Sequence, residues 1–206
     1  MTRREALPAR VVVATANRGK LREILALLAP LPVPVVGLEA LPGLRLPPEG
    51  DDYTANAVEK ARAAAAYAGS PALADDSGLE VEGLGAAPGP HSARYGGPGL
   101  DDAGRVARLL GELAGCGGAA RRARFVCAAA LVTPEGEVVT ALGECAGRIA
   151  AAPRGEGGFG YDPIFELDAG GRTLAEVPSE EKNRISHRAR AFRALRPALL
   201  ARLGKG

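Results

Sequence analysis

Residues 123–149, ARFVCAAALVTPEGEVVTALGECAGRI, decide the fold class of this 206-residue chain. The two apolar runs Ala123–Thr133 and Glu137–Ile149 flank Pro134-Glu135-Gly136, and this arrangement predicts a β-hairpin. Hairpins join antiparallel strands, whereas parallel strands need a longer crossover that is usually helical. Since helical patterns also alternate with strand patterns along this chain, we expect an α/β fold whose sheet is mixed rather than purely parallel.

Hydrophobic periodicity and turn residues predict the other elements. A β-branched run at Arg10–Thr15 predicts a buried strand, and apolar residues at helical spacing follow over Gly19–Ala29. Stretches rich in Gly and Pro predict loops at Leu41–Asp52, Gly83–Gly99 and Gly155–Pro163. The remaining expectations are a strand at Val33–Leu38, a helix at Tyr53–Ala68, a brief strand at Pro71–Ala74, a helix at Asp101–Ala114, a short hairpin of Ile164–Leu167 with Arg172–Ala175, and a last helix that Ser179 caps and Pro197 bends or interrupts.

Length and composition limit the classes of protein. We expect one domain over residues 1–206. A net charge of +2 argues against a protein that coats nucleic acid, and no apolar run approaches the ~20 residues of a membrane helix. Three cysteines without a close pair, Cys116, Cys127 and Cys145, and the lack of an export signal predict reduced core thiols in a cytoplasmic protein.

Rare residue types direct attention to three clusters. The chain has 26 Lys and Arg residues, of which four are Lys, and it has three Asn, two His and no Gln. Lys and Arg are not interchangeable where a compact charge is needed, so the positions that keep a rare type are candidates for function. The clusters are Asn17 with Lys20, Asn56 with Lys60, and Lys182-Asn183 with His187.

The first cluster lies at a predicted strand-to-helix turn, Thr15-Ala16-Asn17-Arg18-Gly19-Lys20. Free N–H groups and the positive end of a helix dipole bind phosphate well at such a turn. The spacing of a Walker A loop is absent. The alternative is a plain helix cap followed by a surface lysine.

Two adjacent carboxylates follow the predicted strand Pro71–Ala74, in the run Asp75-Asp76-Ser77-Gly78. Successive strand residues point to opposite faces, so we expect one carboxylate to face a cation and the other to accept from local backbone donors. Oxygen ligands of this kind suit Mg²⁺ better than zinc. The alternative is an Asx turn between strands.

The loop Gly155–Pro163 holds two of the chain's few aromatic residues, Phe159 and Tyr161, among glycines. A ring held in this way can stack on a purine, and the alternative is an aromatic residue that fills the core under the loop. In the predicted last helix, four-residue spacing places Lys182 with Ser186 and Asn183 with His187. The alternative there is a solvated charged face.

The second cluster lies on the predicted helix Tyr53–Ala68, where Asn56 and Lys60 share a face. Lys60, together with Arg94 of the long loop, can meet phosphate oxygens. Their alternatives are an exposed helix lysine and an arginine that anchors the loop.

Taken in order, these stretches resemble the inosine triphosphate pyrophosphatase family, also called dITP/XTP pyrophosphatases, from Val11 to about Ala191. The parts that carry the resemblance are Thr15–Lys20, Ala74–Leu79, Ser92–Tyr95, Gly158–Phe165, and Glu181-Lys182 followed by Ile185–Arg188. The resemblance implies a mixed twisted sheet flanked by helices, in two lobes with a central cleft. It implies Mg²⁺-dependent hydrolysis of ITP, dITP and XTP to the monophosphate and pyrophosphate, which cleanses the nucleotide pool. A homodimer that binds small nucleoside triphosphates, and neither nucleic acid nor a membrane, is also implied.

The resemblance assigns roles to individual residues. Asp76, Lys20 and Lys60 would be catalytic, and Asp76 would also bind the metal. The family's second metal carboxylate precedes the second helix; here Glu49 lies one place off the usual register, and Asp51 or Asp52 stays open. The implied substrate-binding residues are Thr15, Ala16, Asn17, Arg18, Gly19, Lys20, Ser77, Arg94, Phe159, Gly160, Tyr161, Asp162, Lys182, His187 and Arg188.

The implied chemistry is attack of water on the α-phosphorus. A carboxylate bound to Mg²⁺ is a poor base, so either Asp76 or another group accepts the proton. Donors aimed at the six-position oxygen, from His187, Arg188 or the backbone, would reject adenine. Guanine shares that oxygen, so its two-amino group has to be excluded by shape or by an unpaired contact.

Two alternative functions stay open at this point. One is a related pyrophosphatase that acts on modified or pyrimidine nucleotides. The other is an RNA-binding module that uses Phe159, Tyr161 and the arginines, and it predicts salt-sensitive binding without a metal. The low net charge and the acidic Asp75-Asp76 pair oppose the second.

Overall fold

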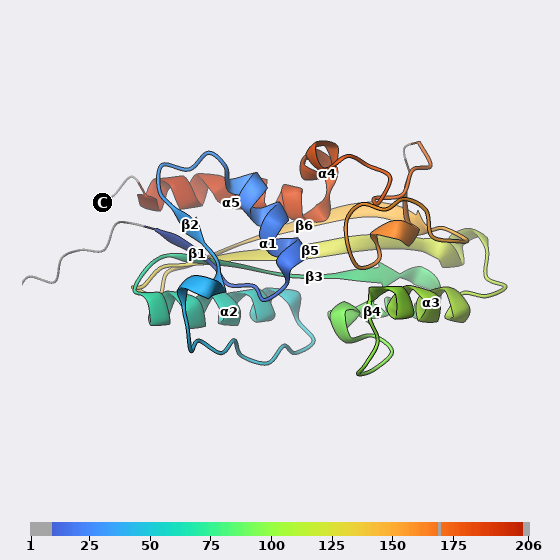
Figure 1. The fold of residues 1–206 in the computed structure, drawn as a ribbon, viewed down its shortest axis with the longest axis horizontal. Coiled ribbons are helices and arrows are strands. Elements are labelled where there is room, and N and C mark those ends of the chain that lie inside the picture. Colours follow the sequence, from blue (N-terminus) through green and yellow to red (C-terminus); the bar gives the residue numbers. More distant parts are fainter. Residues whose placement is uncertain (1–9, 169, 204–206) are drawn as a thin grey trace, which may run out of the picture.

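A seven-stranded sheet runs through the molecule, with helices on both of its faces (Figure 1). The computed structural model describes residues 10–168 and 170–203. The strand order is β2-β1-β3-β5-β6-β7, and β4 pairs with β3 outside this path. The strands are β1 (Val11–Val13), β2 (Val35–Val36), β3 (Ala72–Val81), β4 (Pro88–Gly89), β5 (Arg122–Val132), β6 (Val138–Ile149) and β7 (Phe165–Leu167).

The sheet is mixed, as predicted. Strand β1 pairs in parallel with β2 and β3, and every other pairing of named strands is antiparallel. The predicted hairpin is confirmed: β5 and β6 pair from Arg122↔Arg148 to Val132↔Val138. In its turn Thr133 N donates to the Glu137 carbonyl over 3.0 Å. Gly136 has a φ of 91°, a conformation that glycine adopts without strain.

Within the described residues, five α-helices accompany the sheet: α1 (Arg18–Leu28), α2 (Tyr53–Ala68), α3 (Asp102–Glu112), α4 (Ser179–Ile185) and α5 (His187–Leu203). Figure 1 shows α1 and α5 on one side of the sheet and α2 on the other, and α2 packs on β3 and β5 whereas α5 packs on β5 and β6. Within the described part of the chain, no helix combines the length and the apolar character that crossing a membrane requires.

Helix α2 lies close to the sheet because its inner face consists of small residues. Ala57, Ala61 and Ala64 are 0% exposed. The helix begins where the Asp52 carboxylate accepts the Ala55 N–H over 2.7 Å, and it ends at Gly69 with a φ of 57°. The prediction of a helix at residues 53–68 is therefore confirmed.

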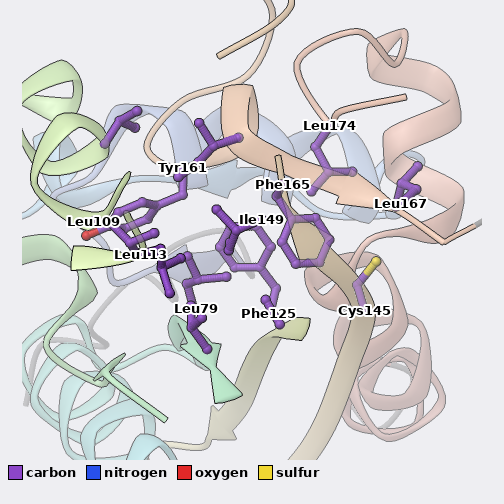
Figure 2. Close-up of a cluster of buried hydrophobic side chains, with 14 of the residues drawn as sticks. Leu79, Leu109, Leu113, Phe125, Cys145, Ile149, Tyr161, Phe165, Leu167 and Leu174 are labelled. Atoms are coloured by element: carbon purple, nitrogen blue, oxygen red, sulfur yellow. The ribbon is translucent and has the colours of Figure 1, made fainter. Parts of the chain in front are cut away.

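Three groups of buried apolar side chains form the core. One lies between the sheet and α1 with α5, and includes Ile24, Leu131 and Phe192. A second, rich in alanine, lies between the sheet and α2. Figure 2 shows the third, which joins α3 to β3, β5 and the loop that precedes β7. In this group Phe125 packs on Phe165, with ring centroids 4.6 Å apart.

Two predicted strands and a predicted hairpin differ in the structure. The strand expected at Pro71–Ala74 continues to Val81, because its later residues pair with β5 along their whole length. The strand expected at Val33–Leu38 shortens to Val35–Val36, and a 3₁₀ helix follows at Leu38–Ala40. The short hairpin after residue 164 consists of β7 and a single bridge between Glu166 and Thr173, and residue 169 of its turn lies outside the described residues.

The predicted last helix is two helices. The helical conformation is interrupted at Ser186, between α4 and α5. The Ser186 hydroxyl accepts the Ala189 N–H over 3.2 Å at the start of α5. Ser179 is the first residue of α4, and Pro178 before it makes no side-chain cap, so the predicted Ser179 cap is wrong. Pro197 lies inside α5 and does not interrupt it.

The hairpin offers a matched test of core packing. Leu131 on β5 is fully buried, whereas Leu142 on β6 is 62% exposed. We expect Leu131→Ala to lower the free energy of unfolding by about 2–5 kcal/mol, because it leaves a cavity. Leu142→Ala should change it by less than about 0.5 kcal/mol. Urea unfolding measures both values, and equal losses in the two variants would contradict the assignment of the buried face.

Candidate active site

Two adjacent carboxylates lie in the middle of β3, on opposite faces of the sheet. Asp75 and Asp76 are 0% and 2% exposed. Asp75 contacts side chains of α1 and α5, whereas Asp76 contacts side chains of α2. The expectation of opposite faces is confirmed. The expectations that one carboxylate would accept from backbone donors, and that the pair would end a strand in a turn, are wrong, because each accepts from side chains within a continuous strand.

Asp75 binds two cations. Its Oδ2 accepts from Arg188 Nε at 3.1 Å and Nη2 at 3.0 Å, and Lys20 Nζ lies 3.3 Å away. The Ser77 hydroxyl also donates to this oxygen over 3.0 Å. Burial alone would raise the pKa of Asp75, but the charges of Lys20 and Arg188 outweigh it and hold that pKa far below its usual range. Asp75 is therefore an anion in the folded protein.

The ion pairs continue from Arg188 into a buried network. Arg188 Nη1 contacts Glu23 at 2.5 Å, and Lys182 Nζ contacts Glu23 at 2.7 Å and Asp162 at 2.5 Å. Buried charges are costly unless each is paired, and removal of one partner is strongly destabilising. Here the charges balance, since three cations face three carboxylates. The members are Lys20, Lys182, Arg188, Glu23, Asp75 and Asp162.

On the other face of β3, Asp76 lies against α2. Asn56 Nδ2 donates to Asp76 Oδ2 over 2.7 Å, and Lys60 Nζ lies 3.4 Å from Oδ1. Burial raises the pKa of Asp76, Lys60 and Lys20 lower it by less, and Glu49 raises it further, so the net shift is upward. Burial lowers the pKa of Lys60, but Asp76 and its other acidic neighbours more than reverse this, so Lys60 is charged. The predicted common face of Asn56 and Lys60 is confirmed.

A loop before α2 brings Glu49 beside Asp76. Lys60 Nζ donates to Glu49 Oε1 over 2.6 Å, so one ammonium contacts both carboxylates. The Asn56 side chain fixes this loop through two hydrogen bonds with the backbone of Gly50, at 2.7 and 3.0 Å. Arg94 adds contacts to Glu49 at 3.2 and 3.4 Å.

The other two candidates for the second carboxylate lie elsewhere. The side chain of Asp51 is 89% exposed and pairs with His91 over 2.9 Å. Asp52 caps α2. Of the three carboxylates that the sequence left open, Glu49 is the one joined to Asp76 through Lys60.

The predicted phosphate turn is also a helix cap. The Asn17 side chain accepts the Lys20 N–H over 3.0 Å, and the Thr15 hydroxyl accepts the Asn17 N–H over 3.2 Å. Lys20 is not a surface lysine, since its side chain is 14% exposed and reaches Asp75. Gly19 is required by close packing: a Cβ there would lie 2.6 Å from Phe159 Cδ1. Arg18 is exposed and lines neither of the two site pockets described below, so the structure does not bring it into the site.

The two aromatic residues of the glycine-rich loop have different surroundings. Phe159 is half-buried, with Lys182 Nζ 5.1 Å and Arg188 Cζ 5.8 Å from its ring centroid. Its N–H donates to Asp162 Oδ2 over 2.8 Å, which fixes the loop. Tyr161 is part of the core group in Figure 2, and its hydroxyl donates to the Ser92 carbonyl over 3.0 Å. The alternative interpretation, a ring that fills the core, therefore applies to Tyr161.

His187 is a buried, neutral residue. Its ring stacks on Phe125 with centroids 4.7 Å apart and planes 12° apart. Burial, together with the nearby charges of Arg188 and Lys182, holds the pKa of His187 well below its usual range. Since α4 ends before Ser186, the predicted pairings of Lys182 with Ser186 and of Asn183 with His187 on one continuous helix face are wrong.

Two pockets meet at Lys20 and Ser77. The first has a volume of about 160 Å³ and lies over Phe159, Lys182, His187 and Arg188. The second, of about 190 Å³, is lined by Thr15, Lys60, Asp76 and Glu49. Asn17, Lys20, Ser77 and Ala93 line both. Within residues 10–168 and 170–203, no group of three or more His, Cys, Asp or Glu side chains is placed to hold a metal ion. The carboxylates that line the second pocket are Glu49 and Asp76.

Sequence reasoning missed Glu23 and the pair Asp102 and Arg105. Glu23 joins Lys182 to Arg188, but nothing in the sequence separates it from an ordinary helix-surface glutamate. Asp102 Oδ2 accepts the Gly160 N–H over 2.8 Å and so ties α3 to the aromatic loop. Arg105 lines the first pocket. Contacts of this kind join segments far apart in sequence, and one sequence carries no signal for them.

The mixed sheet, with a pocket walled by paired cations beside a pocket that holds two carboxylates and lysines, is typical of an α/β enzyme for a phosphorylated small molecule. Residues 11–198 match the Ham1 family. The dITP/XTP pyrophosphatase of Geobacter sulfurreducens is 47% identical over 191 residues, which cover 92% of this chain and 96% of that relative. That of Thermus thermophilus is 48% identical over 187 residues, 90% of this chain and 89% of the relative.

Solved structures agree with this match. The HAM1 protein from Coxiella burnetii has a TM-score of 0.83 at 39% identity, over 93% of this chain and 98% of its own. The nucleoside-triphosphatase, or dITP/XTP pyrophosphatase, of Mycobacterium abscessus has a TM-score of 0.73 at 44% identity, over 91% of this chain and 99% of its own. This chain belongs to the Ham1 family, and it is a nucleoside-triphosphate pyrophosphatase, a hydrolase of phosphoric anhydride bonds. The predicted family and fold class are confirmed.

The Asp75 ion pairs predict a strong stability effect. Asp75→Asn leaves Lys20 and Arg188 without their common carboxylate, so it should lower the free energy of unfolding by about 3–5 kcal/mol at pH 7. Asp51→Asn, at a side chain that is 89% exposed, is the matched control and should change it by less than about 0.5 kcal/mol. Urea unfolding compares the two variants with the wild type.

The difference in the free energy of unfolding between wild type and Asp75→Asn should depend on pH. Because the folded pKa of Asp75 lies below its unfolded value of about 3.9, its stabilisation is present above that value. It is lost as the pH falls toward the folded pKa. The stability gap between wild type and Asp75→Asn should therefore be constant above about pH 5 and narrow below about pH 4. A gap that stays constant down to pH 3 would contradict this account.

Proposed function

We propose that this enzyme hydrolyses the non-standard purine nucleotides dITP, XTP and ITP to the monophosphate and pyrophosphate with Mg²⁺, and so removes them from the nucleotide pool. The names of the relatives as dITP/XTP pyrophosphatases support the substrates. The observation that carries the proposal is the junction of the two pockets at Lys20 and Ser77. One pocket suits a nucleoside, and the other suits the phosphates.

The charges of the second pocket support the placement of the triphosphate there. Lys20 and Lys60 line it and supply positive charge, while Thr15 and Ser77 supply hydroxyl groups. The first pocket then receives the nucleoside, with Phe159 as a stacking surface. Stacking of a base on an aromatic ring contributes about 1–3 kcal/mol.

The residues of the second pocket fit Mg²⁺. Glu49 and Asp76 are both carboxylates and both lie beside Lys60 Nζ, at 2.6 and 3.4 Å. Burial and, to a smaller extent, Glu49 raise the pKa of Asp76, so a cation beside the two carboxylates would favour the ionised form of Asp76. Mg²⁺ is usually held by one or two carboxylates and by substrate phosphates. When bound, it would neutralise charge on the phosphates and on the leaving pyrophosphate.

The remaining chemistry belongs to side chains of this chain. Water attacks the α-phosphorus, and pyrophosphate leaves. Asp76 is the candidate acceptor for the proton of the attacking water, and its place in the wall of the phosphate pocket supports that role. Lys20 and Lys60 stabilise the charge that develops on the phosphate oxygens. Asn56, through its hydrogen bond to Oδ2, orients the Asp76 carboxylate.

Base selection would occur in the first pocket. A hydrogen-bond donor aimed at the six-position can bind the oxygen that hypoxanthine and xanthine carry there. Adenine carries an amino group at that position, so the donor would have no acceptor. His187 is a neutral ring whose Nδ1 is buried without a partner among the described residues, so this ring suits the role. Arg188 fits it less well, because its donors already contact Asp75, Glu23 and Ser77.

A product assay tests the proposed function. Purified protein with Mg²⁺ is incubated with dITP, XTP, ITP, GTP or ATP, and nucleotides and pyrophosphate are separated and quantified. Monophosphate and pyrophosphate from the first three, with ATP and GTP nearly untouched, is the expected result. A diphosphate with inorganic phosphate would overturn the proposed bond cleavage, and turnover of pyrimidine or methylated nucleotides instead would replace the substrates.

Asp76→Asn should separate activity from stability. We expect turnover to fall by at least about 10³-fold, because the variant loses the proton acceptor and a metal carboxylate. The free energy of unfolding at pH 7 should change by no more than about 1 kcal/mol, since burial already disfavours the ionised Asp76. Turnover assays and urea unfolding measure the two effects. A variant with near-normal turnover would refute the mechanism.

Glu49→Gln tests the second carboxylate. The variant should need roughly tenfold more Mg²⁺ for half-maximal turnover, and calorimetric titration with Mn²⁺ should show weaker binding. Asp51→Asn, which changes a neighbouring carboxylate that pairs with His91, is the control and should leave both values unchanged. If Asp51→Asn weakened binding and Glu49→Gln did not, the assignment of Glu49 would be wrong.

A further inference from the structure

The start of α3 belongs to the part of the first pocket that the phosphate pocket does not share. Asp102 and Arg105 line the first pocket and not the second, whereas Lys20 and Ser77 line both. A nucleotide that places its phosphates against Lys20 and Lys60 therefore places its base in the pocket whose wall includes the start of α3. This step rests on the function proposed above.

The other cations of the first pocket are already paired. Lys20 contacts Asp75, Arg188 contacts Asp75 and Glu23, and Lys182 contacts Glu23 and Asp162. Their charges and most of their donors hold the pocket together. They are poor candidates for a donor that distinguishes one base from another.

Arg105 differs from them. Its side chain is 17% exposed, and the carboxylate oxygen of Asp102 lies 3.8 Å from its Nη1, beyond hydrogen-bond distance. Its Nε is buried without a partner among the described residues. The oxygen of Asp102 that accepts a hydrogen bond takes it from Gly160 N, at 2.8 Å. Arg105 therefore brings a charged donor to the pocket wall, and its donors have no hydrogen-bond acceptor within residues 10–168 and 170–203.

We propose that Arg105 is a specificity-determining residue that reads the two-position of the purine, favouring xanthine over hypoxanthine and rejecting guanine. Xanthine carries an oxygen there, which accepts a hydrogen bond from the guanidinium. Hypoxanthine carries a hydrogen, and guanine carries an amino group that is itself a donor. The xanthine ring is also the more acidic of the oxopurines, so the charge of Arg105 favours it further. When the guanidinium of Arg105 faces the amino group of guanine, both groups are donors and neither has an acceptor.

Arg105→Gln tests this role through ratios of kcat/KM. The ratio for XTP over ITP should fall roughly 10- to 100-fold, the effect of one hydrogen bond to a charged group. The loss should appear in the KM for XTP, with kcat on ITP unchanged. The ratio for GTP over ITP should rise, because the unpaired donor is gone. Arg105→Lys keeps the charge and should recover part of the XTP preference.

Arg108→Gln is the matched control. Arg108 lies one turn further along α3, with a side chain 59% exposed that pairs with Glu112 and does not line the pocket. This variant should keep the wild-type ratios. Calorimetric binding of XMP and IMP gives the same comparison without turnover. Equal ratios in wild type and Arg105→Gln would overturn the role of Arg105, whereas a wild type that produces no monophosphate and pyrophosphate would overturn the proposed function.

Discussion

The contact of Asp75 with Lys20 and Arg188 is the interaction on which the rest of the site depends. A fully buried carboxylate on the central strand is tolerable only because α1 and α5 each bring a cation to it. Arg188 and Glu23 then hold Lys182 and Phe159 at the wall of the first pocket. Packing of α1 and α5 on the sheet therefore also forms the pocket. Separation of either helix from the sheet would leave the buried Asp75 without one of its cations.

Alternation along β3 divides two tasks between neighbouring residues. Asp75 faces α1 and α5 and holds the fold, and its pKa is driven down by paired cations. Asp76 faces α2 and an open pocket, and its pKa is driven up by burial. Two carboxylates of the same type thus differ because the sheet presents them to different helices. Strand β3 lies between the parallel edge and the antiparallel hairpin, so both of its faces are covered at the centre of the sheet.

Local patterns predicted much of this. Apolar spacing gave α1, α2, the hairpin and the mixed sheet, and rare residue types pointed to Lys20, Asn56, Lys60, Lys182 and His187. The length of β3 was not predictable, because polar Asp75-Asp76 breaks the apolar run and pairing with β5 overrides this local signal. The roles of Glu23 and Arg105 come from contacts with segments far away in the sequence, so no local sequence pattern indicates them. The homodimer, the cytoplasmic location and the single domain over residues 1–206 stay predictions.

The central claim is that the base and the phosphates occupy separate pockets joined at Lys20 and Ser77. A crystal structure of the Asp76→Asn protein with XTP and Mg²⁺ tests it most directly. The account predicts the triphosphate against Lys20 and Lys60, the base over Phe159, and Arg105 at the two-position oxygen. Density for the base beside Glu49 and Lys60, or for the phosphates against Phe159 and Arg105, would contradict it.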